Sequence, residues 1–367
     1  MQVHIERALR LAGASALLTF SVVLALGGDA GGAKSGNETI GLKIQVAAMA
    51  VDSQGTLAYV TSINSSQISM VNLTTKQVSA IPIRKGSNIN NVALTPNNRE
   101  LFVTSNGSNS VGYSRTLYVV DTKSMRVTST INVGGSSSAV AFGPGGRMAY
   151  VVAGDGSYGS GEALKTIDVA SHKIVHSFPI PSGSSMVTVD PRDGDVYVAS
   201  NSSSGTDNSP ASLEAINAIT GKVVATFGPG NGEACGLAFN PKATLLYESF
   251  CASVGSGSTA PPMQVIDTKK DSVESKISID GGSRGIAISP NGKLVYTAVD
   301  KNYGLDVISS STNSIVGFIP VATDSPISIL NLTTIDSDGQ YIYATTFSFG
   351  GYSQFFRIEL EGKASAA

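Results

Sequence analysis

The stretch that decides the fold is residues 289–321, SPNGKLVYTAVDKNYGLDVISSSTNSIVGFIPV. Its residues 290–292, Pro-Asn-Gly, are a turn signal, and segments rich in β-branched and aromatic residues follow at 294–299, 304–308 and 314–321. One more apolar segment, residues 285–288, comes directly before the turn. Four short strands in succession are the unit from which a β-propeller blade is built.

The same pattern occurs seven times along the chain, at intervals of about 47 residues. Each copy has an aromatic residue in its second strand and a turn residue, Pro or Ser, six positions earlier. Since a lone four-stranded sheet buries little apolar surface, the copies need neighbours on both faces, which a closed ring provides. The repeat therefore predicts an all-β, seven-bladed propeller of four-stranded antiparallel blades. The aromatic residues are Tyr59, Phe102, Tyr150, Tyr197, Tyr247, Tyr296 and Tyr343, and the turn residues are Ser53, Pro96, Pro144, Pro191, Pro241, Pro290 and Ser337.

Six of the predicted third strands end on a small polar residue that follows two apolar ones. Such side chains accept hydrogen bonds from the backbone N–H groups of the next turn, so we expect them to cap the hairpin to the fourth strand. These residues are Asn72, Asp121, Asp168, Asn217, Asp267 and Ser309.

The seventh copy ends after its third strand, at residues 355–360. A spare apolar segment, residues 40–46 (IGLKIQV), precedes the first full copy. We expect this N-terminal strand to complete the seventh blade and close the ring, because an open ring would leave an unpaired strand edge.

The copies resemble the YVTN repeat, named for a Tyr-Val-Thr-Asn string in the second strand. The string is YVTS at residues 59–62, FVTS at 102–105 and YVAS at 197–200, and the VID of the third strand is found at 265–267. This resemblance covers residues 38–360. It implies a seven-bladed propeller of the kind grouped with lactonases, surface-layer proteins and propeller subunits of some oxidoreductases, and it specifies fold more than function.

The first 33 residues differ from the rest of the chain. Arg7 and Arg10 precede an uncharged apolar run at residues 11–26, and small residues follow at 27–33. This order predicts a signal peptide at residues 1–33 and a single propeller domain at 34–367, with an uncleaved anchor as the alternative. We therefore expect a secreted, periplasmic or cell-surface protein without a membrane span after signal removal.

The charge of the chain argues against one class of partner. The net charge is −2, so the chain has no overall positive field to attract nucleic acid. The sequence also contains no haem, quinone or flavin motif, and we expect no cofactor.

Four connections between the second and third strands are enlarged: residues 105–116, 153–164, 200–212 and 249–263. Two of them carry a tyrosine, Tyr113 and Tyr158. Loops on a rigid scaffold are frequent recognition sites, although neutral insertions of this length also cost little. Both interpretations remain open.

A second candidate site is the mouth of the expected central channel, where the innermost strands begin. Arg284 could bind a carboxylate or phosphate there, or it could form a surface pair with Glu233. The candidate ring at the mouth is Ala47, Asn90, Ser138, Ser185, Cys235, Arg284 and Asn331.

The two cysteines, Cys235 and Cys251, fall in the first and second strands of the fifth copy. A hairpin turn near residues 241–244 places residue 235 opposite about residue 250. The two sulfur atoms are then neighbours, and an oxidising compartment would allow a disulfide.

Catalytic chemistry has little support in the sequence. After signal removal the histidines are His172 and His176, which lie in the outer hairpin of the third copy and lack further ligands for a metal. The leading hypothesis is an exported, non-catalytic binding propeller whose loop face meets a protein, carbohydrate or small-molecule ligand. The alternatives are a lactonase-like hydrolase using Glu233 and Arg284, and a propeller subunit of a redox complex whose partner holds the cofactor.

Overall fold

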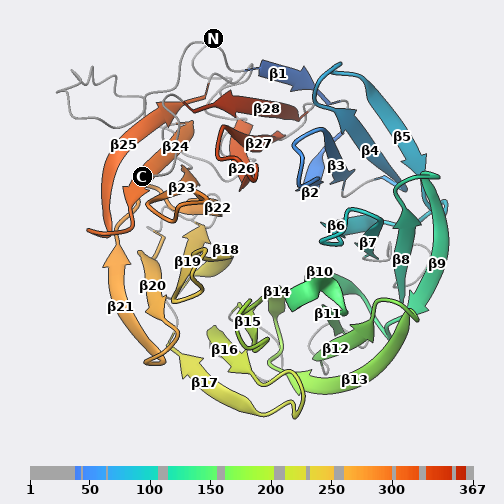
Figure 1. Ribbon diagram of the computed structural model, residues 1–367, viewed down its shortest axis with the longest axis horizontal. Helices are drawn as coiled ribbons and strands as arrows, with labels where there is room; N and C mark the ends of the chain where they lie inside the picture. The colour runs from blue at the N-terminus through green and yellow to red at the C-terminus, as the bar shows by residue number, and fades with distance from the viewer. Residues whose placement is uncertain are drawn as a thin grey trace, which may run out of the picture.

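The computed structural model describes residues 38–42, 44–62, 65–105, 115–154, 162–201, 211–228, 232–251, 260–299, 303–321, 328–348 and 353–360. These residues form seven sheets, each of four antiparallel strands. Figure 1 shows the sheets arranged as blades around a common axis, with the first strand of each copy nearest the centre. The all-β, seven-bladed fold predicted from the repeat is confirmed.

Each of the first six blades follows the chain outward from the axis. Blade 1 contains β2 (Val46–Val51), β3 (Leu57–Ser62), β4 (Gln67–Asn72) and β5 (Val78–Pro82); blade 2 contains β6 (Ile89–Leu94), β7 (Glu100–Ser105), β8 (Thr116–Asp121) and β9 (Arg126–Asn132); blade 3 contains β10 (Ser137–Phe142), β11 (Met148–Gly154), β12 (Glu162–Asp168) and β13 (Lys173–Ile180). Blade 4 contains β14 (Ser184–Val189), β15 (Val196–Ser200), β16 (Ser212–Ile216) and β17 (Val223–Phe227); blade 5 contains β18 (Glu233–Phe239), β19 (Leu245–Cys251), β20 (Met263–Asp267) and β21 (Ser272–Ile277); blade 6 contains β22 (Ser283–Ile288), β23 (Leu294–Val299), β24 (Gly304–Ser309) and β25 (Ser314–Pro320).

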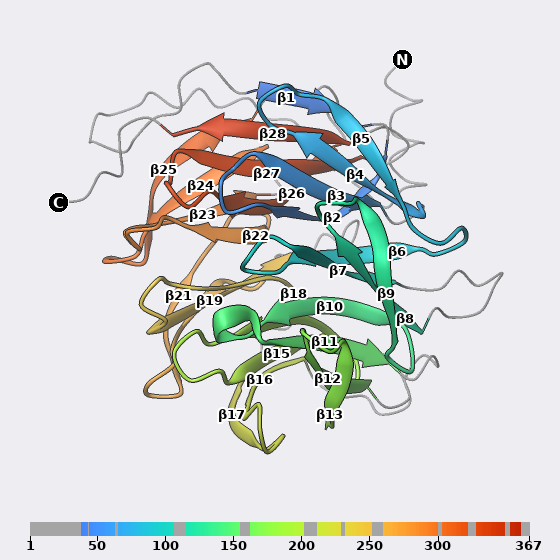
Figure 2. The same cartoon turned by 45° about the vertical axis from the view of Figure 1, so that its right-hand side comes forward.

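Blade 7 joins the two ends of the described chain. It contains β26 (Ser328–Ile335), β27 (Tyr341–Ser348) and β28 (Gln354–Glu359), and its outermost strand is β1 (Glu38–Gly41). Figure 2 shows β1 lying along β28. The expected bounds of the closing strand, residues 40–46, are wrong: β1 pairs with β28 over residues 38–41, and Val46 already belongs to β2.

Ser353, directly before β28, forms hydrogen bonds with the segment that leads from β1 to β2. Its carbonyl accepts a hydrogen bond from Leu42 N at 2.9 Å, and its own N–H donates to Ile44 O at 3.0 Å. Its hydroxyl accepts a bond from Val46 N at 3.1 Å. Because Ser353 is fully buried, these bonds connect the closing strand to the innermost strand of blade 1 away from water.

The core of the molecule lies between the blades. One cluster contains Ile40 and Phe355 of blade 7 together with Val60 and Val71 of blade 1. Comparable clusters join the other neighbouring blades, and the second-strand aromatics are all buried within them, with exposed fractions of 0–6%. Each blade therefore depends on two neighbours for the burial of its apolar faces.

Five of the six expected caps at the ends of the third strands are present; the sixth residue, Ser309, bonds the hydroxyl of Ser311 at 3.0 Å in place of a backbone N–H. Asn72 Oδ1 accepts hydrogen bonds from Thr74 N and Thr75 N at 3.0 and 2.8 Å. Asp121, Asp168, Asn217 and Asp267 accept equivalent bonds. Four residues after the cap, each of these turns has a left-handed residue with φ between 50° and 68°: Lys76, Met125, His172, Gly221, Asp271 and, in blade 6, Asn313.

The single helix among the described residues is a 3₁₀ turn at Pro144–Gly146. Within the described residues, no helix has both the length and the apolar character needed to cross a membrane.

Candidate binding face at the inner ends of the blades

Near its start, the innermost strand of every blade contains a β-bulge, where its register with the second strand shifts. Bulges bend a strand and re-aim its side chains. Five of the candidate ring residues are inside these bulges, and Arg284 and Asn331 directly precede one. The strands themselves begin one to three residues earlier than expected. The bulged candidates are Ala47, Asn90, Ser138, Ser185 and Cys235.

The polar members of this ring bind the neighbouring blade. Thr61 Oγ1 of blade 1 donates to Asn90 O of blade 2 at 2.7 Å. Asn90 Nδ2 in turn reaches Ser138 O of blade 3, and Ser138 Oγ reaches Ser184 O of blade 4, each at a long 3.5 Å. These hydrogen bonds connect blades 1 to 4, so the side chains have a structural role whether or not they also contact a ligand.

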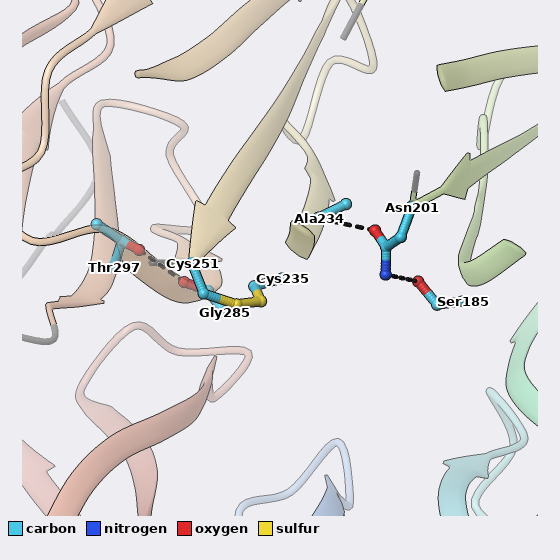
Figure 3. The surroundings of a disulfide bond; sticks show 7 residues. All are labelled: Ser185, Asn201, Ala234, Cys235, Cys251, Gly285 and Thr297. Atoms are coloured by element: carbon cyan, nitrogen blue, oxygen red, sulfur yellow. Dashed lines mark hydrogen bonds between the residues drawn. A yellow bond between two sulfur atoms is a disulfide. The ribbon is translucent and has the colours of Figure 1, made fainter. Parts of the chain in front are cut away.

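Asn201, which the sequence analysis missed, extends the ties from blade 4 to blade 5. Its Nδ2 donates to Ser185 Oγ at 3.2 Å, and its Oδ1 accepts a hydrogen bond from Ala234 N at 3.0 Å (Figure 3). In the sequence Asn201 is one of several polar residues at the start of a Ser-rich loop. No signal distinguished it, because its partner Ala234 becomes a neighbour only when blades 4 and 5 pack.

A disulfide joins Cys235 and Cys251 beside these residues, with a Cα–Cα distance of 5.7 Å (Figure 3). The register differs by one step from the expected one: Ala234 is opposite Phe250, and Cys235 is the bulged residue that follows. Cys251 is 3% exposed and also forms an isolated β-bridge with Gly282, which leads into blade 6. The disulfide therefore lies where blade 5 meets blade 6.

The charged candidates lie on neighbouring innermost strands. Glu233 is the exposed first residue of β18, and Arg284 is the half-buried second residue of β22. Within the described part of the chain, no ion pair links these two side chains.

The structure does not place the tyrosine candidates, since Tyr113 and Tyr158 lie outside the described residues. Of Asn331 only the backbone is described, and it pairs with Thr345. His172 and His176 lie on the outer hairpin of blade 3, away from the ring. The sequence analysis missed the partner of His172: its Nε2 lies 3.1 Å from Glu100 Oε1 of blade 2.

The four enlarged loops share one feature at the last residue that the structure describes before the undescribed part of each loop. This residue is bonded to an innermost strand or to the residue directly before such a strand. Ser105 N donates to Ser137 Oγ at 3.1 Å, Gly154 N to Ser136 O at 2.8 Å, and Asn201 N to Gly183 O at 2.9 Å. The fourth, Cys251, is held by its disulfide. We call the side of the ring that bears these four stems the loop face.

Comparison with known proteins agrees with the fold. No family model matches the chain. The seven-bladed beta-propeller protein Rv1057 of Mycobacterium tuberculosis (strain ATCC 25618 / H37Rv) is 31% identical over 128 residues, which are 35% of this chain and 30% of that protein. The match therefore spans less than a third of the relative's length.

Among solved structures, the hydrazine synthase of Kuenenia stuttgartiensis has a chain that superposes with a TM-score of 0.67 and 18% identity, covering 86% of this chain and 96% of that one. Identity at this level shows a shared fold and no more. Fold and comparisons together define a seven-bladed β-propeller protein.

Proposed function

We propose that the chain is an exported, non-catalytic binding propeller that contacts its ligand through the loop face. The observation that carries this proposal is the fastening of all four loop stems to the inner ring. Binding loops gain precision when the elements that hold them are rigid. Four enlarged loops with fixed stems on one side of the disc suit recognition of a partner rather than neutral insertion.

The neutral hydrogen-bonding groups near the axis favour an uncharged polar ligand. The side chains of Asn90, Ser138, Ser185 and Asn201 are amides and hydroxyls that also bond other protein groups, so a ligand would share these groups or compete for them. Such groups match the hydroxyls of a carbohydrate, which is the first ligand class that we would test.

Export is the second part of the proposal. It rests on the order of residues 7–33, basic then apolar then small, and a disulfide suits an oxidising compartment. The protein would then be secreted, periplasmic or attached to the cell surface.

The test is binding to an immobilised glycan panel, with the wild type and two shortened variants. In one variant residues 202–210 are replaced by Gly-Ser, and in the control the outer hairpin turn 218–221 of the same blade is replaced by Asn-Gly. We expect the first change to abolish glycan binding and the second to preserve it. Retained binding in the first variant, or no glycan bound by the wild type, would overturn the proposal in this form.

The same preparation tests the hydrolase alternative, which uses Glu233 and Arg284 on neighbouring innermost strands. Wild-type hydrolysis of a lactone panel, lost in Glu233→Gln and in Arg284→Ala, would replace the binding proposal with that alternative.

A further inference from the structure

Glu248 in β19 is an acid buried between blades. It follows Tyr247 directly and is only 3% exposed. The corresponding position, directly after the second-strand aromatic, is uncharged in the other six blades. Glu248 is thus an acid at a buried position that is small or apolar in the other copies of the repeat. Departures of this kind from the expected pattern tend to mark functional sites. The uncharged residues are Val60, Val103, Val151, Val198, Thr297 and Ala344.

The side chain of Glu248 faces blade 4. Leu246, two residues earlier, packs in a cluster with Tyr197 and Leu213 of that blade, whereas Tyr247 packs toward blade 6. Since side chains alternate along a strand, Glu248 lies on the same face as Leu246. It is therefore placed at the joint between blades 4 and 5.

Gln264 of β20 is directly opposite Glu248 in the register of the sheet, and such pairs have Cβ atoms about 5 Å apart. Gln264 is 1% exposed, and its Nε2 donates to Gly228 O of blade 4 at 3.2 Å. Its Oε1 is buried and has no hydrogen-bond partner among the described residues. Because Nε2 is already engaged by Gly228, the amide is oriented, and Oε1 still requires a donor.

We propose that Glu248 is protonated in the folded protein and donates its proton to Gln264 Oε1, forming a proton-dependent clasp between blades 4 and 5. A neutral carboxylic acid has one O–H donor, whereas the ionised form offers acceptors only. Ionisation of Glu248 would therefore place two hydrogen-bond acceptors, its carboxylate and Gln264 Oε1, next to each other between blades 4 and 5, which is unfavourable.

The electrostatic setting agrees with this geometry. Burial raises the pKa of Glu248 to about 7. On β16, Glu214 lies between Leu213 and Ala215, which face blade 5, so Glu214 faces blade 3. On the strands beside β19, Glu233 is at the exposed start of β18 and Asp267 at the end of β20, where it caps a turn. In β15 there is no charged residue. The cation on this face of the sheet, Lys276 of β21, is exposed and is opposite Gln264, one strand further from Glu248.

The sign of the pH dependence follows from the raised pKa. A carboxyl whose pKa is higher in the folded state than in the open state favours folding below the open-state value, and this advantage is lost as pH rises toward the folded value. For Glu248 the window runs from about pH 4.5 to about pH 7. Within it the joint should open more readily with each step toward neutral pH.

The test is hydrogen exchange of β15, β19 and β20 between pH 5 and pH 7, corrected for intrinsic rates. We expect opening at the joint to increase by about 30-fold in the wild type. In Glu248→Gln, whose amide also donates a hydrogen bond, hydrogen exchange at the joint should be slow and independent of pH. In Glu248→Val the exchange should also be independent of pH. The control Glu359→Gln, an exposed acid of β28, should keep the wild-type response.

A second measurement tests the protonation of Glu248 itself. Because the pKa of Asp306 is also raised, to about 6, infrared spectra are recorded in the Asp306→Asn background. There a protonated carboxyl band should be present at pH 6 and lost by pH 8, and it should be missing once Glu248→Gln is added. Absence of the band, or a pH response that persists in Glu248→Gln, would overturn the proposal.

Discussion

Asp306 in β24 is an individual side chain with a pH response of its own. Burial, followed by the nearby charge of Asp280, raises the pKa of Asp306 to about 6. An acid with a raised folded-state pKa favours folding most at low pH, and the benefit is lost between about pH 4 and 6. We expect Asp306→Asn to stabilise the protein at pH 7, by up to about 1 kcal/mol once solvent screening is included. Urea unfolding at pH 4 and pH 7 measures this difference.

The matched control for Asp306 is Asp338→Asn, which changes an exposed carboxylate in the first turn of blade 7. The control should leave the difference between pH 4 and pH 7 as it is in the wild type. An equal effect of both substitutions would mean that general charge repulsion, rather than the environment of Asp306, sets the response.

Gly221 illustrates how one turn position fits into the ring. It has φ of +68°, and a Cβ atom at this position would overlap the ring of Phe178 in blade 3. Gly221→Ala should therefore cost about 1 kcal/mol for backbone strain and a further 1–3 kcal/mol for the overlap. Gly194→Ala is the control, because its φ is +83° and its Cβ would lie 3.9 Å from the nearest atom. Equal losses in thermal unfolding for both variants would show that Phe178 moves aside freely.

Sequence reasoning succeeded for side chains with local partners and failed for those with partners in another blade. Asn72 caps a turn two and three residues away, so its role follows from its position in the repeat. Asn201 binds Ser185 within blade 4 and Ala234, 33 positions distant, which becomes a neighbour only when blades 4 and 5 pack. Glu248 was missed for the same reason, because its burial depends on blade 4.

At the level of strands, the disulfide fastens the start of β18 to the end of β19, across a sequence separation of 16 residues. Closing a loop of this size adds about 3 kcal/mol at most. We expect Cys235→Ala with Cys251→Ala to lower stability by up to that amount while the fold persists, measured by urea unfolding. Alkylation of the denatured protein, purified without a reductant, should modify no cysteine before reduction and two after it. Alkylation of the unreduced denatured protein would show that the bond is not formed.

The strands also show how far a repeat can define boundaries. In the unit quoted first, the second strand was placed at 294–299, and β23 has the same bounds. The closing strand was misplaced because residues 40–46 (IGLKIQV) are one mostly apolar segment, although its first residues pair with β28 and Val46 pairs with β3 in blade 1. The apolar pattern indicates that both segments are buried but not which sheet each one joins.

For the molecule as a whole, closure of the ring depends on β1, the one strand that pairs the N-terminal and C-terminal parts of the described chain. Ile40 is 7% exposed and Leu42 is 2% exposed, and both pack against Phe355 and residues of blade 1. A chain that starts at Leu42 should leave β28 with an unpaired edge and Phe355 partly uncovered. Loss of Ile40 alone removes about 2–4 kcal/mol, so we expect a melting temperature lower by several degrees.

The comparison chain starts at Glu38 and differs only in retaining β1. It should remain monomeric in light scattering, whereas the shorter chain should associate with time and concentration, because an exposed strand edge pairs with other chains. The substitution Ile40→Asp in the longer chain separates the two effects: it removes the apolar contact but keeps backbone pairing available. If the ring closes through β1, the order of stability is the chain from Glu38, then Ile40→Asp, then the chain from Leu42. Equal melting temperatures and a monomeric short chain would show that blades 1 and 7 hold together without the strand, through their innermost residues and Ser353.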